Sequence, residues 1–139
     1  MFFRDDGNNV VDAINRALPS ASSSAAAPII AAVRGQLQTD ASSQIYTHNP
    51  ESDTFVIQWN KVRTKTSSSV RLAFQVVLKS NGTIRFYCQS LTGVTSSFSY
   101  STGIQKAVST TSPIGIGIAS QAPLSSAPGQ FLRLRVSRP

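Results

Sequence analysis

The sequence contains one cysteine and one histidine in 139 residues. A single cysteine cannot build an internal disulfide framework, and one cysteine with one histidine cannot supply the usual ligands of a zinc site. No apolar run approaches the roughly 18 residues of a membrane-spanning helix. Charged residues are only 14% of the chain and hydrophobic residues 40%, which argues against global disorder. We expect one folded domain that has no membrane span and needs no metal or other cofactor.

The chain also lacks a recognisable secretory leader at its start. Residues 1–6, MFFRDD, bring charges before any long apolar stretch, unlike a signal peptide. Two expectations follow and both stay open. Either the protein remains inside the cell, or this sequence is part of a longer secreted chain.

Side-chain carboxylates are nearly confined to the first part of the chain. Four of the six acids lie within the first forty residues and the last is Asp53, so the final 86 residues have none. With a net charge of +7, the surface favours polyanions such as acidic glycans or nucleic acid. The basic residues alternate with apolar ones, so no nucleic-acid motif emerges, and solvation or packing within an assembly explains them as well. The candidate polyanion contacts are Arg63, Arg71, Arg85, Arg133 and Arg135.

The first 28 residues differ in pattern from the remainder. Apolar residues at three- and four-residue steps predict a short helix over residues 8–18, which Pro19 ends. Residues 19–28, PSASSSAAAP, are small and of low complexity, which is typical of a linker or surface loop. We therefore divide the chain into an N-terminal helix with a Ser/Ala-rich linker, 1–28, and a domain over 29–139.

From residue 29 onward the pattern is strand after strand, separated by turn-forming residues. About 7–8 short antiparallel strands predict an all-β domain, a β-sandwich or jelly roll. Turns are expected at Asn49-Pro50, at Ser67–Ser69 and at Gly93, among others. The predicted strands outside the central hairpin cover residues 29–33, 44–47, 54–62, 98–105, 114–119 and 130–136.

The central hairpin can be predicted in detail around Asn81-Gly82. A three-residue loop over 80–82 pairs Leu78 with Ile84 and gathers the apolar side chains on one face, whereas a two-residue loop mixes apolar and polar residues on both faces. The longer loop also puts Gly82 where a left-handed backbone is needed. Together with the strand over 54–62, this register predicts one buried layer made of Phe55, Ile57, Trp59, Phe74, Val76, Leu78, Ile84 and Phe86.

No catalytic constellation is visible in the sequence. His48, the only candidate base, lies in a segment expected to be a loop, and the hairpin register directs Cys88 toward Phe74 in the core. No G-x-S-x-G elbow and no paired carboxylates accompany them. We expect a protein that is not an enzyme. The exposed hairpin tip carries the sequon Asn81-Gly82-Thr83, so Asn81 is a candidate glycosylation site if the chain is secreted.

Three segments, in order, resemble the nidogen-like β-sandwich modules. They are an F-x-x-x-W strand at Phe55–Trp59, an fQvvL-x-x-nGtIrF hairpin over residues 74–86, and a T-x-G-I-Q strand over residues 102–105. The likeness covers about residues 29–106. It implies a non-enzymatic module of the kind found in large extracellular and cell-surface proteins, where such modules serve as structural and adhesive parts.

The functional expectation is therefore a structural or adhesive subunit of an extracellular or cell-surface assembly, with other protein subunits as partners. One alternative is a module whose basic face binds a polyanion, either an acidic glycan or nucleic acid. Another is a jelly-roll subunit of a virus or of a large intracellular complex, which the missing leader favours. The sequence leaves all three open.

Overall fold

The computed structural model describes residues 29–93, 100–105, 115–120 and 129–135, with side chains over 29–93 and 100–104. The described residues form nine strands and no helix, so the all-β class is confirmed for this part of the chain. The predicted helix over 8–18 and the linker over 19–28 lie outside the described residues.

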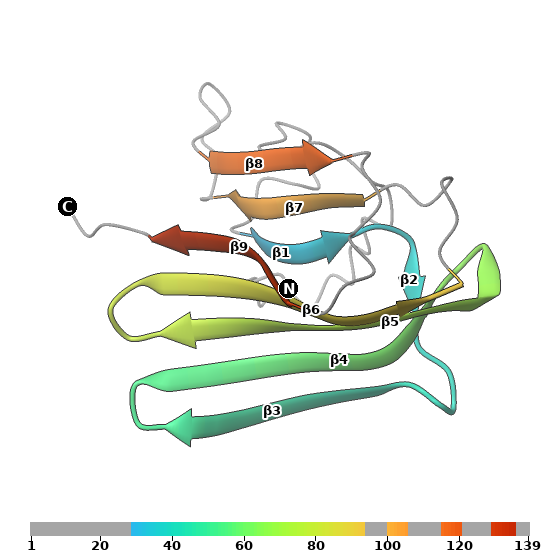
Figure 1. Ribbon diagram of the computed structural model, residues 1–139, viewed down its shortest axis with the longest axis horizontal. Helices are drawn as coiled ribbons and strands as arrows, with labels where there is room; N and C mark the ends of the chain where they lie inside the picture. The colour runs from blue at the N-terminus through green and yellow to red at the C-terminus, as the bar shows by residue number, and fades with distance from the viewer. Residues whose placement is uncertain (1–28, 94–99, 106–114, 121–128, 136–139) are drawn as a thin grey trace, which may run out of the picture. The chain divides into compact units, whose positions relative to one another are not determined.

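The strands belong to two antiparallel sheets in two compact units (Figure 1). The smaller sheet has the order β1-β7-β8, and β1 pairs with β7 across a bulge between Ala31 and Arg34. The larger sheet has the order β2-β4-β5-β6-β9, with β3 also paired to β4. How the two sheets stack, and hence the sandwich itself, stays a prediction. The strands are β1 (Ile29–Arg34), β2 (Leu37–Gln38), β3 (Gln44–Glu51), β4 (Thr54–Thr64), β5 (Ser67–Lys79), β6 (Thr83–Thr92), β7 (Tyr100–Gln105), β8 (Gly115–Ser120) and β9 (Gly129–Arg135).

The predicted hairpin is confirmed residue by residue. Leu78 pairs with Ile84, and Phe74 pairs with Cys88. The Gly82 amide donates to the Lys79 carbonyl across the three-residue loop, 3.0 Å, and Gly82 has φ 81°, in the left-handed region. The register prediction succeeds because a one-residue slip would turn every apolar side chain toward the opposite face.

Two predicted turns are wrong. Ser67–Ser69 belong to β5, and the chain turns instead at Lys65-Thr66, where the Ser67 amide donates to Thr64 Oγ1. Asn49-Pro50 lie within β3, and the turn follows at Ser52-Asp53. Proline is tolerated there because β3 lies at a sheet edge and its register shifts between His48 and Glu51. Strand pairing overrides the turn propensity of serine and proline at both places.

The core of the larger sheet lies on one face, which we call the apolar face. The eight residues of the predicted layer share it, because each pairs in register with the next across β4, β5 and β6. Five of them are buried, whereas Trp59 and Leu78 are half-buried and Phe55 is 38% exposed. The prediction of one buried layer is therefore confirmed for five residues and wrong for Phe55, Trp59 and Leu78, which are only partly covered. Trp59 still stacks on Phe74, with ring centroids 5.0 Å apart.

Candidate binding face

The opposite face of the larger sheet carries amide, phenol and basic side chains together with Val56 and Val77, of which Val56 is buried, and we call it the polar face. One row across the strands runs from Tyr46 through Gln58 and Gln75 to Tyr87. Gln58 Nε2 also donates to Gln89 Oε1, 3.1 Å. A sheet that is apolar on one face and polar on the other presents the polar side as its surface for solvent or ligands. The predicted polyanion contacts that can be placed in register lie along this face.

Arg63 and Arg71 form one group of those contacts, and both bind Asp40. They pair with each other across β4 and β5. Arg71 Nη1 is 2.7 Å from Asp40 Oδ2, and Arg63 Nε is 3.5 Å from the same oxygen. The hydroxyl of Ser42 donates to the other carboxylate oxygen, 2.7 Å. Hydrogen bonds from Ser42 and then Arg71 hold the pKa of Asp40 well below its usual range, so the carboxylate stays charged. These two arginines are already partly neutralised.

Arg85, Arg133 and Arg135 form the second group, on β6 and β9. Arg85 pairs with Arg133, and Thr83 pairs with Arg135, so three basic positions adjoin at one edge of the sheet. Arg85 Nη1 lies 3.5 Å from the Tyr87 hydroxyl, and its buried Nε has no hydrogen-bond partner among the described residues. No carboxylate is paired with Arg85 in that part of the chain. The structure thus separates the five predicted arginines into a partly neutralised pair and a second group of three.

The tip of the β5–β6 hairpin displays Asn81. Its side chain is exposed, and its Oδ1 accepts a hydrogen bond from the Thr83 amide, 3.0 Å. Thr83 itself is buried at the start of β6. The asparagine of the sequon is therefore accessible at a turn, as the sequence predicted.

The candidate catalytic residues lie on opposite faces of the larger sheet. His48 is an exposed residue of strand β3, opposite Val56, so its predicted loop location is wrong. Cys88 is a free thiol buried on the apolar face, opposite Phe74, as predicted. Burial raises the pKa of the Cys88 thiol and keeps it protonated. The geometry gives these two residues no common site.

Metal and membrane signatures are absent from the described residues. No group of three or more His, Cys, Asp or Glu side chains there is arranged to hold a metal ion. The described ranges also include no helix of the length and apolarity that a bilayer crossing requires.

Comparison with known protein families gave a match. A family model described as NIDO-related matches residues 2–130. The chain belongs to the NIDO-related family. The nidogen-like resemblance is therefore confirmed, over more of the chain than the three segments suggested. Comparison with curated proteins and with solved structures gave no match.

In this NIDO-related chain, the segments that carried the resemblance are β4, the β5–β6 hairpin and β7. The hairpin and β4 build the centre of the larger sheet, and β7 is the middle strand of the smaller one. The recognisable residues are thus mainly framework, and the polar face is formed by the residues that alternate with them.

Sequence reasoning missed two features of this NIDO-related chain. Asp40 gathers Arg63 and Arg71, although it stands 31 positions before Arg71. The sequence Asp40-Ala41-Ser42-Ser43 is typical of a turn and could have been predicted as one. It does not indicate which arginines form ion pairs with Asp40. The other is Lys61, which has φ 53° at a break in the β4 register. Nothing in the sequence distinguishes that lysine from its neighbours.

Proposed function

We propose that this chain is a structural or adhesive module of an extracellular or cell-surface assembly, and that it does not act as an enzyme. The observation that carries the proposal is the NIDO-related match along residues 2–130, since modules of this family are typically extracellular. The separation of His48 from Cys88 on opposite faces supports the non-enzymatic part.

Whether the sequon at Asn81 can be glycosylated is a first test of compatibility with secretion. When the chain is expressed behind a secretory leader in a eukaryotic cell, we expect a glycan at this exposed turn. An endoglycosidase should then lower its apparent mass, Asn81→Gln should remove the shift, and Thr83→Ser should keep it, because serine also completes the sequon.

The assembly role needs a separate measurement on cells that make the protein. An antibody against the chain should label intact, unpermeabilised cells or the insoluble matrix around them. Retention of all the protein in the cytosol would overturn the proposed location, and the intracellular alternative would replace it.

Polyanion binding is a second candidate function, favoured by the three adjoining basic positions at the β6–β9 edge. Neutralising phosphates or sulfates releases counterions, so binding should weaken as salt rises. We expect the double change Arg133→Gln with Arg135→Gln to lower the salt needed for elution from heparin. The matched change Arg63→Gln with Arg71→Gln should lower it less, because Asp40 already occupies that pair. Elution of the unaltered protein at or below physiological salt would reduce this surface to ordinary solvation.

A further inference from the structure

Strand β3 forms an exposed edge of the larger sheet. All eight of its residues, Gln44–Glu51, are exposed. It pairs with β4 on one side, and no strand within the described ranges pairs with its other side (Figure 1). An edge of this kind presents a row of backbone amides and carbonyls that can accept a further strand.

The apolar face is also unfinished at this edge. On the inner strands β5 and β6, Val76 and Phe86 are fully buried. Toward the edge, Ile45 on β3 is 53% exposed and Phe55 on β4 is 38% exposed. The large apolar side chains that are exposed in the described residues are these two and Tyr46, at 44%. All three lie on β3 or on its neighbour. Ile45 and Tyr46 lie on β3 itself, on opposite faces, so a strand added beside β3 would contact exposed apolar side chains as well as pair with backbone groups.

The usual protection of a sheet edge is present only at one end of β3. Pro50 and the register shift between His48 and Glu51 interrupt the strand there. From Gln44 to His48 the ladder with β4 is regular and contains no proline, lysine or arginine. These five residues leave a continuous stretch open to pairing.

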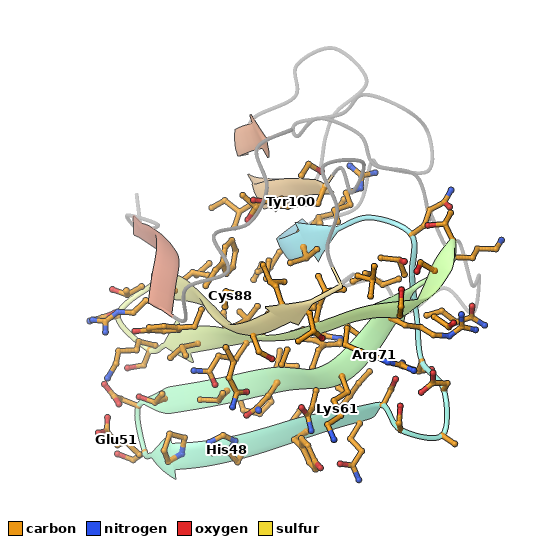
Figure 2. All side chains as sticks on the ribbon, turned by 45° about the vertical axis from the view of Figure 1, so that its right-hand side comes forward. His48, Glu51, Lys61, Arg71, Cys88 and Tyr100 are labelled. Carbon is orange, nitrogen blue, oxygen red and sulfur yellow. The ribbon has the colours of Figure 1, made fainter. Side chains whose placement is uncertain are left out.

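The charges at the two ends of this ribbon have opposite sign. Glu51 and Asp53 lie where β3 turns into β4, and the Glu51 side chain is 67% exposed although it meets Lys79 Nζ at 3.3 Å. Lys61 is exposed toward the other end of the ribbon and makes no ion pair with a described residue. Figure 2 shows Glu51 and Lys61 well apart along the ribbon. An antiparallel contact between two identical edges would bring the acidic end of each to the basic end of the other.

We propose that two copies of this chain pair through β3, antiparallel about a two-fold axis, to form one continuous sheet. The exposed backbone edge, the uncovered Ile45 and Tyr46 on β3, and the opposite charges at the two ends favour this partner. The pairing does not depend on the proposed extracellular role, since localisation and glycosylation would be unchanged without it.

The test is the mass of the full chain in solution as a function of concentration. Sedimentation equilibrium should show a reversible approach to twice the 14.8 kDa chain mass. Amide exchange over residues 44–48 should slow as the dimer fills, because those groups gain partners. A protein that stays monomeric at every soluble concentration overturns the proposal.

Two sets of variants locate the interface. Ile45→Lys places a charge on the edge of both copies and should raise the dissociation constant roughly tenfold or more. Ser68→Lys, an equal change of charge at an exposed position of β5, should leave it unchanged. Circular dichroism confirms that each variant is folded. A dimer that Ile45→Lys does not weaken would use another surface and overturn the proposal.

Charge reversal tests the antiparallel arrangement itself. Glu51→Lys and Lys61→Glu should each weaken the dimer, and the double variant should recover most of the loss, because opposite charges meet again. A double variant that is as weak as the sum of the two changes would overturn the two-fold antiparallel pairing.

Discussion

Phe86 and Phe55 share the apolar face of the larger sheet but differ in how much of each ring is covered. Phe86 is fully buried, whereas Phe55 is 38% exposed beside the β3 edge. Removing a buried ring leaves a cavity as well as losing its transfer free energy. We expect Phe86→Ala to lower the free energy of unfolding by about 3–5 kcal/mol and Phe55→Ala by less than about 1.5 kcal/mol, in urea melts. Equal losses would mean that Phe55 is covered as fully as Phe86.

Trp59 is intermediate between Phe86 and Phe55 in how much of its side chain is covered. It is half-buried and stacks on Phe74, so part of its area remains in water. The fully buried layer predicted from alternation alone assigns it the cost of a core tryptophan. Because Trp59 is only half-buried, we expect its removal to cost less stability than the removal of a fully buried tryptophan.

Lys61 has a left-handed backbone, which is costly for a residue with a side chain. Its φ is 53°, and its carbonyl accepts hydrogen bonds from Ser43 Oγ at 2.9 Å and Arg71 Nη1 at 3.3 Å. The conformation costs a non-glycine residue about 1–2 kcal/mol. We expect Lys61→Gly to leave stability unchanged or raise it by up to about 1 kcal/mol, despite the poor strand propensity of glycine. Lys61→Val should destabilise the fold, since a β-branched residue fits this conformation worst. Thermal melts of both variants measure these two changes in stability.

The ends of strands β5 and β6 make different demands on two glycines. Gly82 in the hairpin loop has φ 81° and Gly93 after β6 has φ 67°. A Cβ added at Gly93 would lie 2.5 Å from the backbone oxygen of Ser69, so β5 and β6 approach closely there. Gly82→Ala should cost about 1–2 kcal/mol through backbone strain alone. Gly93→Ala should cost more, because one of the two strands must also shift. Urea melts that rank them in the reverse order would contradict the close approach.

Asp40 joins the segment before β3 to strands β4 and β5, and its ionisation links that junction to pH. Its pKa is lowered from an ordinary value of 3.8 by hydrogen bonds from Ser42 and Arg71. A carboxyl group whose pKa is lower in the folded state stabilises the fold above its unfolded pKa and loses that contribution as pH falls. We expect the unaltered protein to lose stability from about pH 5 to about pH 2, and Asp40→Asn to flatten that decline. An unchanged slope in urea melts across this range would show that Asp40 contributes nothing to acid sensitivity.

At the scale of the whole molecule, two ladders join distant parts of the chain, whereas β3–β4, β4–β5 and β5–β6 join consecutive strands. β1 pairs with β7 and β6 pairs with β9, each across a long separation in sequence. Such ladders require long loops to close before they gain stabilising contacts, so they slow folding. We expect refolding from urea, followed by Trp59 fluorescence, on a scale of roughly milliseconds to seconds. A relaxation in microseconds would be inconsistent with this topology.

The pairing of strands also explains which predictions succeeded and which failed. Strand positions and the β5–β6 register follow from alternation over neighbouring residues, and a slip is penalised at every apolar position in turn. The turns at Asn49-Pro50 and Ser67–Ser69 were wrong because local propensity was outweighed by pairing with β4. The predicted loop location of His48 was wrong for the same reason. Its segment has the composition of a loop, but pairing with β4 makes it a strand.

Some features of the candidate site could be predicted from the sequence, and others only from the tertiary structure. The sequence by itself determined the all-β class, the nidogen-like kinship, the exposed Asn81 turn and the buried Cys88, because each depends on residues close together in the chain. The tertiary structure decided that Asp40 forms ion pairs with Arg63 and Arg71, and that Arg85 pairs with Arg133 across β6 and β9. It also decided that the buried part of the apolar face does not extend to β3, where Ile45 is exposed. Those features depend on which strands lie side by side, and no local pattern of side chains specifies that.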